Sequence, residues 1–340
     1  MRAASRLLSL STSIVMVAFC GFTGVAHAAT QHVYPGGSIS GAVASSSSGD
    51  TVVVHAGTYP KQTISKAFGS TVSLQAAPGE VVAVQGFEFL GASHLALSGL
   101  RIEPDSTSVS GVRIANQAHD ISVTQSTLVG GQFNVRLYGH GSNSSTEAKP
   151  SSEWPYNIRI ADSELVGAAI DNVQIDGARD MTIEHNYIHD PQANDDHNDG
   201  IQSTASDRLR ILRNVLAAPG TAGPDQGIIL GRANPPDSYG YRKVTNTEVV
   251  NNLVHQWRGL GIILGGTDAT AVVNNTAYDN GDGTWAGFTM SAKNDPAKFQ
   301  NTNARLVNNV FDRMSVGSGS DSPAVESHWS APGSVDTVDR

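Results

Sequence analysis

The stretch "TEVVNNLVHQWRGLGIILGGTDATAVVNNTAYDN" (247–280) contains two copies of one short pattern. In each copy, alternating apolar residues lead to a pair of asparagines, and further apolar residues follow. Between the copies stands "LGIILG" (260–265), a glycine-led apolar run of ordinary strand length. No helical period separates these runs, so the pattern favours a succession of short β-strands.

The pattern recurs along the chain, as in "MTIEHNYIHD" (181–190), "LRILRNVLAA" (209–218) and "ARLVNNVFDR" (304–313). The spacing between copies runs from the low twenties to the high thirties of residues, which is typical of a parallel β-solenoid. One polar position is shared by all copies, and we expect its side chains to point inward and to bond along a stack. That position holds Ser126, Ser163, Asn186, Asn214, Asn252, Asn275 and Asn309.

The segment "SISGAVASSSSGDTVVVHAGTY" (38–59) predicts how the solenoid begins. It reads as a short amphipathic helix over Ile39–Ala44, then a turn at Gly49-Asp50 and a strand at 51–54. A helix here would cover the open end of the first coil, which a solenoid needs.

With its "GDTVVVHAGTY" start and its "NN" and "GI" coils, the chain resembles the secreted pectate lyase-like superfamily over roughly residues 30–315. The resemblance implies an all-β fold, a right-handed parallel β-helix with an N-terminal helical cap. That superfamily includes lyases, hydrolases, epimerases and phage tailspikes, so the fold does not fix the activity. We expect the parallel β-helix to span residues 29–315 and a loosely ordered Ser/Gly/Pro-rich tail to span residues 316–340.

Residues 1–28 read as a secretory signal peptide, with Arg2 and Arg6 before an apolar stretch and an Ala26-His27-Ala28 cleavage site. Cys20, the sole cysteine, lies in this segment, so the secreted chain would hold no disulfide. The net charge of −9 argues against nucleic acid as a partner but allows an acidic polysaccharide. We expect no membrane span and a monomer.

An acidic stretch, "DDHND" (195–199), interrupts one coil. Asp195, Asp196 and Asp199 could supply oxygen ligands to a calcium ion, which would relieve their mutual repulsion. The resemblance points the same way, because calcium-dependent pectate lyases carry such a cluster on a coil. The alternative is a solvated acidic turn ending in Asp199-Gly200.

Breaking a uronate 4-O-glycosidic bond by β-elimination requires neutralising the C6 carboxylate, removing the C5 proton and protonating the leaving oxygen. The candidates for these proton transfers or for carboxylate binding are His197, Lys243 and Arg258. The arginine signature "R-x-P-x-x-R" of pectate lyases has no equivalent around Arg258, which puts pectate itself in doubt.

Other side chains near the irregular loops predict sugar binding, since exposed aromatic rings stack on sugar faces. The expected substrate-binding residues are Trp154, Gln202, Arg232, Tyr239, Tyr241 and Trp257. Two rows are expected to be structural: Thr182–Arg210–Glu248, and His189 with His255.

The leading hypothesis is therefore a secreted polysaccharide lyase that acts on an acidic, uronate-containing polymer with calcium. A glycoside hydrolase or a uronate C5-epimerase on the same scaffold remains open, as does a non-catalytic carbohydrate-binding β-helix.

Overall fold

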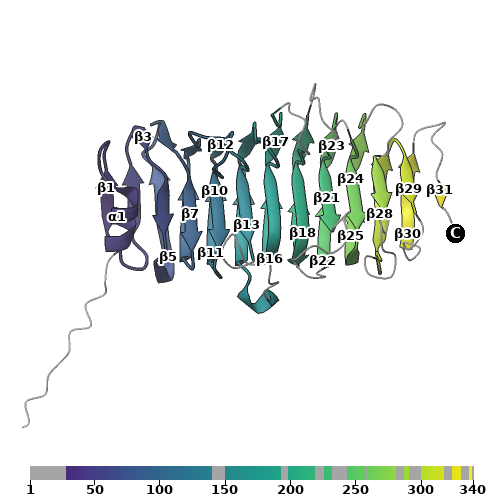
Figure 1. The fold of residues 1–340 in the computed structure, drawn as a ribbon, viewed down its shortest axis with the longest axis horizontal. Helices are drawn as coiled ribbons and strands as arrows, with labels where there is room; N and C mark the ends of the chain where they lie inside the picture. Colours follow the sequence, from purple (N-terminus) through teal and green to yellow (C-terminus); the bar gives the residue numbers. More distant parts are fainter. Residues whose placement is uncertain are drawn as a thin grey trace, which may run out of the picture.

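Alternating apolar and polar residues give each coil up to three short strands, whose apolar side chains fill the interior. The computed structural model describes residues 28–139, 150–192, 198–218, 226–231, 243–257, 259–280, 287–290, 300–317, 324–330 and 337–338. These residues wind into a right-handed parallel β-helix whose coils stack along the long axis (Figure 1). Every strand pairing within them is parallel, as the sequence pattern predicts.

The strands form three faces, which we name A, B and C. Face A consists of β4 (Gln62–Ile64), β7 (Phe87–Leu90), β10 (Val112–Ala115), β13 (Val135–Tyr138), the first part of β16 (Val173–Glu184), the first part of β18 (Ile201–Asp207), β21 (Ile228–Gly231), β24 (Ile262–Gly265), β27 (Phe288–Met290), β29 (Met314–Val316) and β31 (Thr337–Val338).

Face B consists of β1 (Thr30–Val33), β2 (Thr51–Val54), β5 (Ala67–Ala76), β8 (Ser93–Ser98), β11 (His119–Thr124), β14 (Tyr156–Ala161), the second part of β16, the end of β18, β19 (Arg210–Leu212), β22 (Val244–Val250), β25 (Thr267–Val273), β28 (Arg305–Phe311) and β30 (Ala324–Ser330). Face C consists of β3 (Gly57–Tyr59), β6 (Val82–Val84), β9 (Arg101–Ile102), β12 (Thr127–Val129), β15 (Glu164–Val166), β17 (Tyr187–His189), β20 (Val215–Ala217), β23 (Leu253–His255), β26 (Thr276–Tyr278) and the end of β28.

The predicted polar stack forms at the corner between faces B and C, and we call it the asparagine ladder. The Oδ1 atom of Asn214 accepts from both the backbone N–H and the side-chain Nδ2 of Asn186, at 3.0 Å each. Asn214 in turn donates its own N–H and Nδ2 to Oδ1 of Asn252. Ser126 and Ser163 continue the row toward the N-terminus. Each bond gives a partner to a buried polar group, which would destabilise the fold by about 1–3 kcal/mol if it were left unpaired.

The predicted register of both rows is confirmed. Thr182, Arg210 and Glu248 lie in register on face B, and Arg210 Nε donates to Glu248 Oε2 at 2.9 Å. His189 and His255 share one row of face C, with Ala217 between them.

The N-terminal prediction is close to the structure, with a helix α1 (Ile39–Ser45) followed by strand β2. Ser38 Oγ accepts from the N–H of Gly41 at 2.9 Å and so caps the helix, while Ile39 and Val43 are buried. The helix lies beside β1, β2 and β4 at the purple end of Figure 1. In the part of the chain that the structure describes, no helix has the length and hydropathy needed to span a membrane.

At the other end, strand pairing continues beyond residue 315, where we expected the helix to end. Strand β30 pairs with β28, and β31 pairs with β29, although both lie in the Ser/Gly/Pro-rich segment. The low apolar content of this segment therefore did not prevent its backbone from extending the faces, since parallel pairing depends on main-chain groups. The expected signal peptide falls almost wholly on residues 1–27, outside the described residues.

Candidate active site on face A

Long connections border face A on both sides. The chain passes from face C to face A through residues 190–200, 218–227 and 256–261. It passes from face A to face B through residues 139–155, 232–243 and 291–304. Because loops between regular strands carry most binding residues, the outer surface of face A is where the topology favours a substrate.

A row of polar side chains crosses that surface from coil to coil. Arg113, Arg136, Gln174 and Gln202 are in register on β10, β13, β16 and β18. They alternate with inward residues such as Val135 and Val173, so they face outward. Gln202 therefore lies where we predicted, on the outer side of its strand and in register with Gln174.

Two buried carboxylates lie at the edge where the chain enters face A from face C. Asp171 and Asp199 precede β16 and β18, and they are 1% and 0% exposed. The N–H of Asp199 donates to Oδ1 of Asp171 at 2.9 Å. The Asp199 carboxylate accepts from the Gln226 N–H at 3.1 Å and from Gln202 Nε2 at 3.2 Å. Burial, reinforced by the neighbouring Asp199 charge, raises the pKa of Asp171 well above its usual range.

This pKa shift predicts that the stability of the protein depends on pH when no cation is bound. The unfolded chain loses the Asp171 proton near the ordinary pKa of 3.8, while the folded protein keeps it to higher pH. The stability that this proton supplies is therefore full below that value and is lost as pH rises through the folded pKa. In urea unfolding with chelator, Asp171→Asn should lose less stability than wild type from about pH 4 to neutrality. Parallel pH profiles for the two proteins would contradict this.

A third acid, Asp176, lies at the other end of the face A strand and is held by cationic and polar neighbours. Arg136 Nη2 donates to Asp176 Oδ2 at 3.1 Å, while Gln174 Nε2 and Thr204 Oγ1 donate to Asp176 Oδ1 at 2.8 and 3.1 Å. The Arg136 guanidinium lies over the rings of Phe133 and Tyr138, at 4.7 and 5.0 Å. Its Nε is buried without a partner among the described residues. Arg136 is thus a fixed cation at the outer surface of face A.

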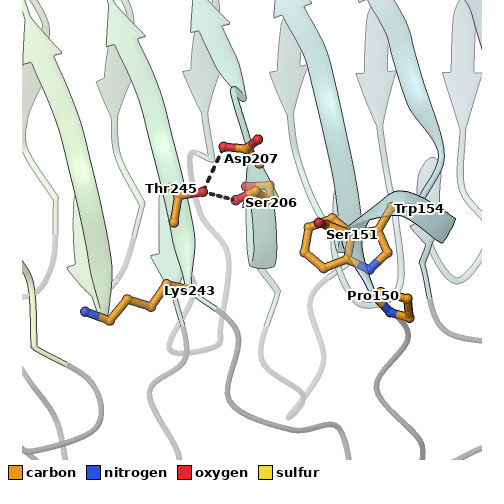
Figure 2. A pocket seen from close by; sticks show the side chains of 7 residues that line it. All are labelled: Pro150, Ser151, Trp154, Ser206, Asp207, Lys243 and Thr245. Atoms are coloured by element: carbon orange, nitrogen blue, oxygen red, sulfur yellow. Dashed lines mark hydrogen bonds between the residues drawn. The ribbon is translucent and has the colours of Figure 1, made fainter.

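A pocket of about 570 Å³ opens at the corner between faces A and B (Figure 2). Its lining residues are Pro150, Ser151, Trp154, Ser206, Asp207, Lys243 and Thr245. Thr245 Oγ1 donates to Asp207 Oδ1 at 2.9 Å. Figure 2 shows the Lys243 side chain extending away from Asp207, and its Nζ donates to the Gln300 carbonyl at 3.1 Å.

The structure does not bring Lys243 and Asp199 together. Asp199 precedes β18, whereas Lys243 precedes β22, which pairs with the far end of β18 at Ser206 and Asp207. The two groups therefore border opposite sides of face A. The other predicted metal or catalytic residues, and three of the substrate-binding ones, lie outside the described residues: Asp195, Asp196, His197, Arg258, Arg232, Tyr239 and Tyr241.

Two aromatic predictions need correction. Trp257 is 0% exposed, and its ring packs against the backbone of Gly200 and Gly227, where an added Cβ would lie 3.0 and 3.4 Å from the indole. Trp154 is 3% exposed and lies over Gly139 and Gly177. Rows of glycine thus leave room for each indole against the coils, and neither tryptophan offers an open ring face to a sugar.

Sequence reasoning missed Asp171 and Arg136. Asp171 stands in "AAIDNVQ", which reads as an ordinary turn. The signal was its position two residues before the strand at 173–176, which matches that of Asp199 before the strand at 201–204 one coil later. Arg136 had a similar signal, because "NVRLYG" aligns it with Gln174 and Gln202.

Comparison with known proteins establishes the fold but no closer relationship. No family model matches the chain, and no curated protein matches it. Matching solved structures include the PL6 family polysaccharide lyase Pedsa3628 from Pseudopedobacter saltans, with a TM-score of 0.51 and 12% identity over 89% of this chain and 88% of that one. An alginate lyase from a Paenibacillus species has a TM-score of 0.50 and 14% identity, covering 90% and 96% of the two chains. The A-module of an Azotobacter vinelandii mannuronan C-5 epimerase has a TM-score of 0.50 and 15% identity, covering 81% and 80%.

Proposed function

Because this chain has the right-handed parallel β-helix fold of the pectate lyase-like proteins, we propose that it is a secreted lyase of an acidic, uronate-containing polysaccharide, with calcium at Asp171 and Asp199. The observation that carries the proposal is the buried pair of carboxylates at the edge of face A. Two carboxyl groups so placed cannot both be charged at little cost unless a proton or a cation relieves them.

The donor atoms of this pair suit a hard cation. Calcium takes six to eight oxygen ligands, and carboxylates are prominent among them. Asp171 and Asp199 would supply two carboxylates from adjacent coils, and Asp195 and Asp196 would add more from the connection just before Asp199. Bound calcium would neutralise the uronate carboxylate and so acidify the C5 proton.

Arg136 would hold the carboxylate of a second sugar unit. Its guanidinium lies one coil from Gln174 on the outer row of face A, and it already binds the Asp176 carboxylate. A planar guanidinium suits paired hydrogen bonds to a carboxylate. Gln174 and Gln202 follow in the same row and present amide groups that fit sugar hydroxyls.

The elimination itself transfers one proton to the protein and one from it. A base takes the C5 proton, the electron pair of that bond forms the C4–C5 double bond, and the C4–O4 bond breaks. An acid then protonates O4. His197 stands two residues before Asp199 in the sequence, which makes it the first choice for one of these roles. Arg258 stays a prediction for the other role, whereas Lys243 borders the opposite side of face A from the carboxylate pair and is not proposed for it.

The first experiment measures absorbance of unsaturated uronate with the mature protein on pectate, alginate, hyaluronan and glucuronan, each with calcium and with chelator. A rise that chelator abolishes is the expected result. A rise that chelator leaves unchanged would contradict the calcium site but not the lyase. Without any rise, new reducing ends would identify a hydrolase, C5 inversion an epimerase, and binding without turnover a carbohydrate-binding protein; each of these would overturn the lyase.

A further inference from the structure

A second group of metal-ligand side chains lies away from the carboxylate pair, on face B. His94 belongs to β8, and His119 and Asp120 belong to β11 in the next coil. One ligand atom from each residue lies within 4.8 Å of the other two, and in the part of the chain that the structure describes no other three His, Cys, Asp or Glu residues meet in this way. All three side chains are partly exposed, so an ion can reach them from solvent.

Two imidazole nitrogens approach the same carboxylate oxygen. Asp120 Oδ2 lies 3.7 Å from His94 Nε2 and 2.5 Å from His119 Nδ1. Ligands about 2.0–2.2 Å from a tetrahedral zinc ion lie roughly 3.3–3.6 Å from one another. The spacing of His94 and Asp120 is close to that value. A small rotation of His119 would lengthen the 2.5 Å distance between its Nδ1 and Asp120 Oδ2. The hydrogen bond between these two atoms would then be replaced by one bond from each atom to the metal.

Neighbouring side chains hold the group in place. The ring of Tyr156 stacks on His119, with 4.5 Å between the ring centroids and 9° between the planes. The Arg179 guanidinium, in register in the following coil, lies over the Tyr156 ring at 4.0 Å from its centroid. Asn157 Nδ2 donates to Asp120 Oδ1, which leaves Oδ2 directed at the two imidazoles. Partners of this kind orient metal ligands in proteins and strengthen binding.

From this geometry we propose that His94, His119 and Asp120 bind a divalent transition-metal ion that clasps two successive coils. Two imidazole nitrogens and one carboxylate oxygen suit zinc and its neighbours, whereas calcium prefers an all-oxygen set. Three protein ligands leave a fourth position for water. Because the ligands come from adjacent coils, the bound ion joins them and stabilises the folded state.

The repeat supplies variants that preserve the backbone. His94 and Asp120 have φ angles of +56° and +52°, and Asn157 and Asn246 occupy the corresponding position in later coils with φ of +52° each. Asparagine tolerates this left-handed conformation well. His94→Asn and Asp120→Asn should therefore remove ligands while the fold remains.

The test is zinc titration of untagged protein by calorimetry, with thermal unfolding and the visible spectrum of the cobalt form as second readouts. We expect one zinc per chain and a melting midpoint several degrees higher at saturation. Each ligand variant should bind zinc at least tenfold more weakly, since even supporting residues typically contribute roughly 10–100-fold. His255→Ala, a histidine stacked on Tyr278 on face C, should bind like wild type.

Zinc binding that His94→Asn and Asp120→Asn leave unchanged, or no zinc binding at all, would overturn the proposal. The calcium site is tested separately by Asp199→Asn, which should leave the zinc response intact, whereas Asp120→Asn should leave any calcium response intact. Failure of either site is therefore distinguishable from failure of the other.

Discussion

Asp199→Asn should lower the rate of uronate elimination by roughly 10²–10³-fold, the range for removing one preorganised electrostatic group from a catalytic site. Asparagine keeps the shape of the side chain, and its Oδ1 can still accept from the Gln226 N–H. The substitution removes the charge, and with it the strongest reason for a cation beside Asp171. It also removes the hydrogen bond that Oδ2 accepts from Gln202 Nε2, because the amide nitrogen of asparagine is a donor. The measurement is the initial rate across a calcium titration, on whichever polymer proves to be the substrate.

The matched control is Glu248→Gln, which makes the same change of charge on face B in the next coil. Glu248 forms an exposed ion pair with Arg210, and such pairs contribute little to stability. The rate and the calcium dependence of the Glu248→Gln variant should equal those of wild type. If Asp199→Asn also retained both, with its fold intact by circular dichroism, calcium at this carboxylate pair would be ruled out.

Trp257→Ala should destabilise the protein by about 3–5 kcal/mol, the usual cost of removing a fully buried large aromatic side chain. The indole is 0% exposed, and the glycine backbones of two other coils pack against it. Collapse of the resulting cavity is limited, because Gly200 and Gly227 are fixed in their strands' hydrogen-bond ladders. Urea unfolding monitored by circular dichroism measures the change.

This prediction separates a core role from a substrate-binding role for Trp257. Trp257→Phe retains most of the apolar volume and removes an indole N–H that has no partner in the described structure, so its loss of stability should be clearly smaller. A folded Trp257→Ala protein with wild-type stability and a raised KM would instead support the sugar-stacking role.

The sequence predicted the scaffold because the scaffold is periodic. The repeated Asn position, the row Thr182–Arg210–Glu248 and the strand at 51–54 all follow from patterns that a single coil repeats. Inward stacking of Asn214 could be predicted because an unpaired buried amide is unfavourable. Its partner therefore had to be the asparagine at the same position of the next repeat, which is Asn252.

The site was less predictable, because it depends on where irregular connections place side chains. The contact of Asp171 with Asp199 spans 28 residues and appears only when two coils are set in register. Trp257 stands in a polar-looking turn, "HQWRG", and its burial follows from glycines in other coils. Lys243 and Asp199 flank irregular segments that border the same face, but at opposite edges, which sequence distance does not reveal.

The asparagine ladder also makes the length of a coil adjustable. Its successive bonds join residues 23 positions apart at Ser163–Asn186, 28 at Asn186–Asn214 and 38 at Asn214–Asn252, yet the corner geometry is the same. The ladder fixes where each turn of the chain begins and leaves the remainder free to lengthen. New segments can therefore be inserted beside face A without disturbing the stack, so the side chains that border this face can change while the scaffold stays constant.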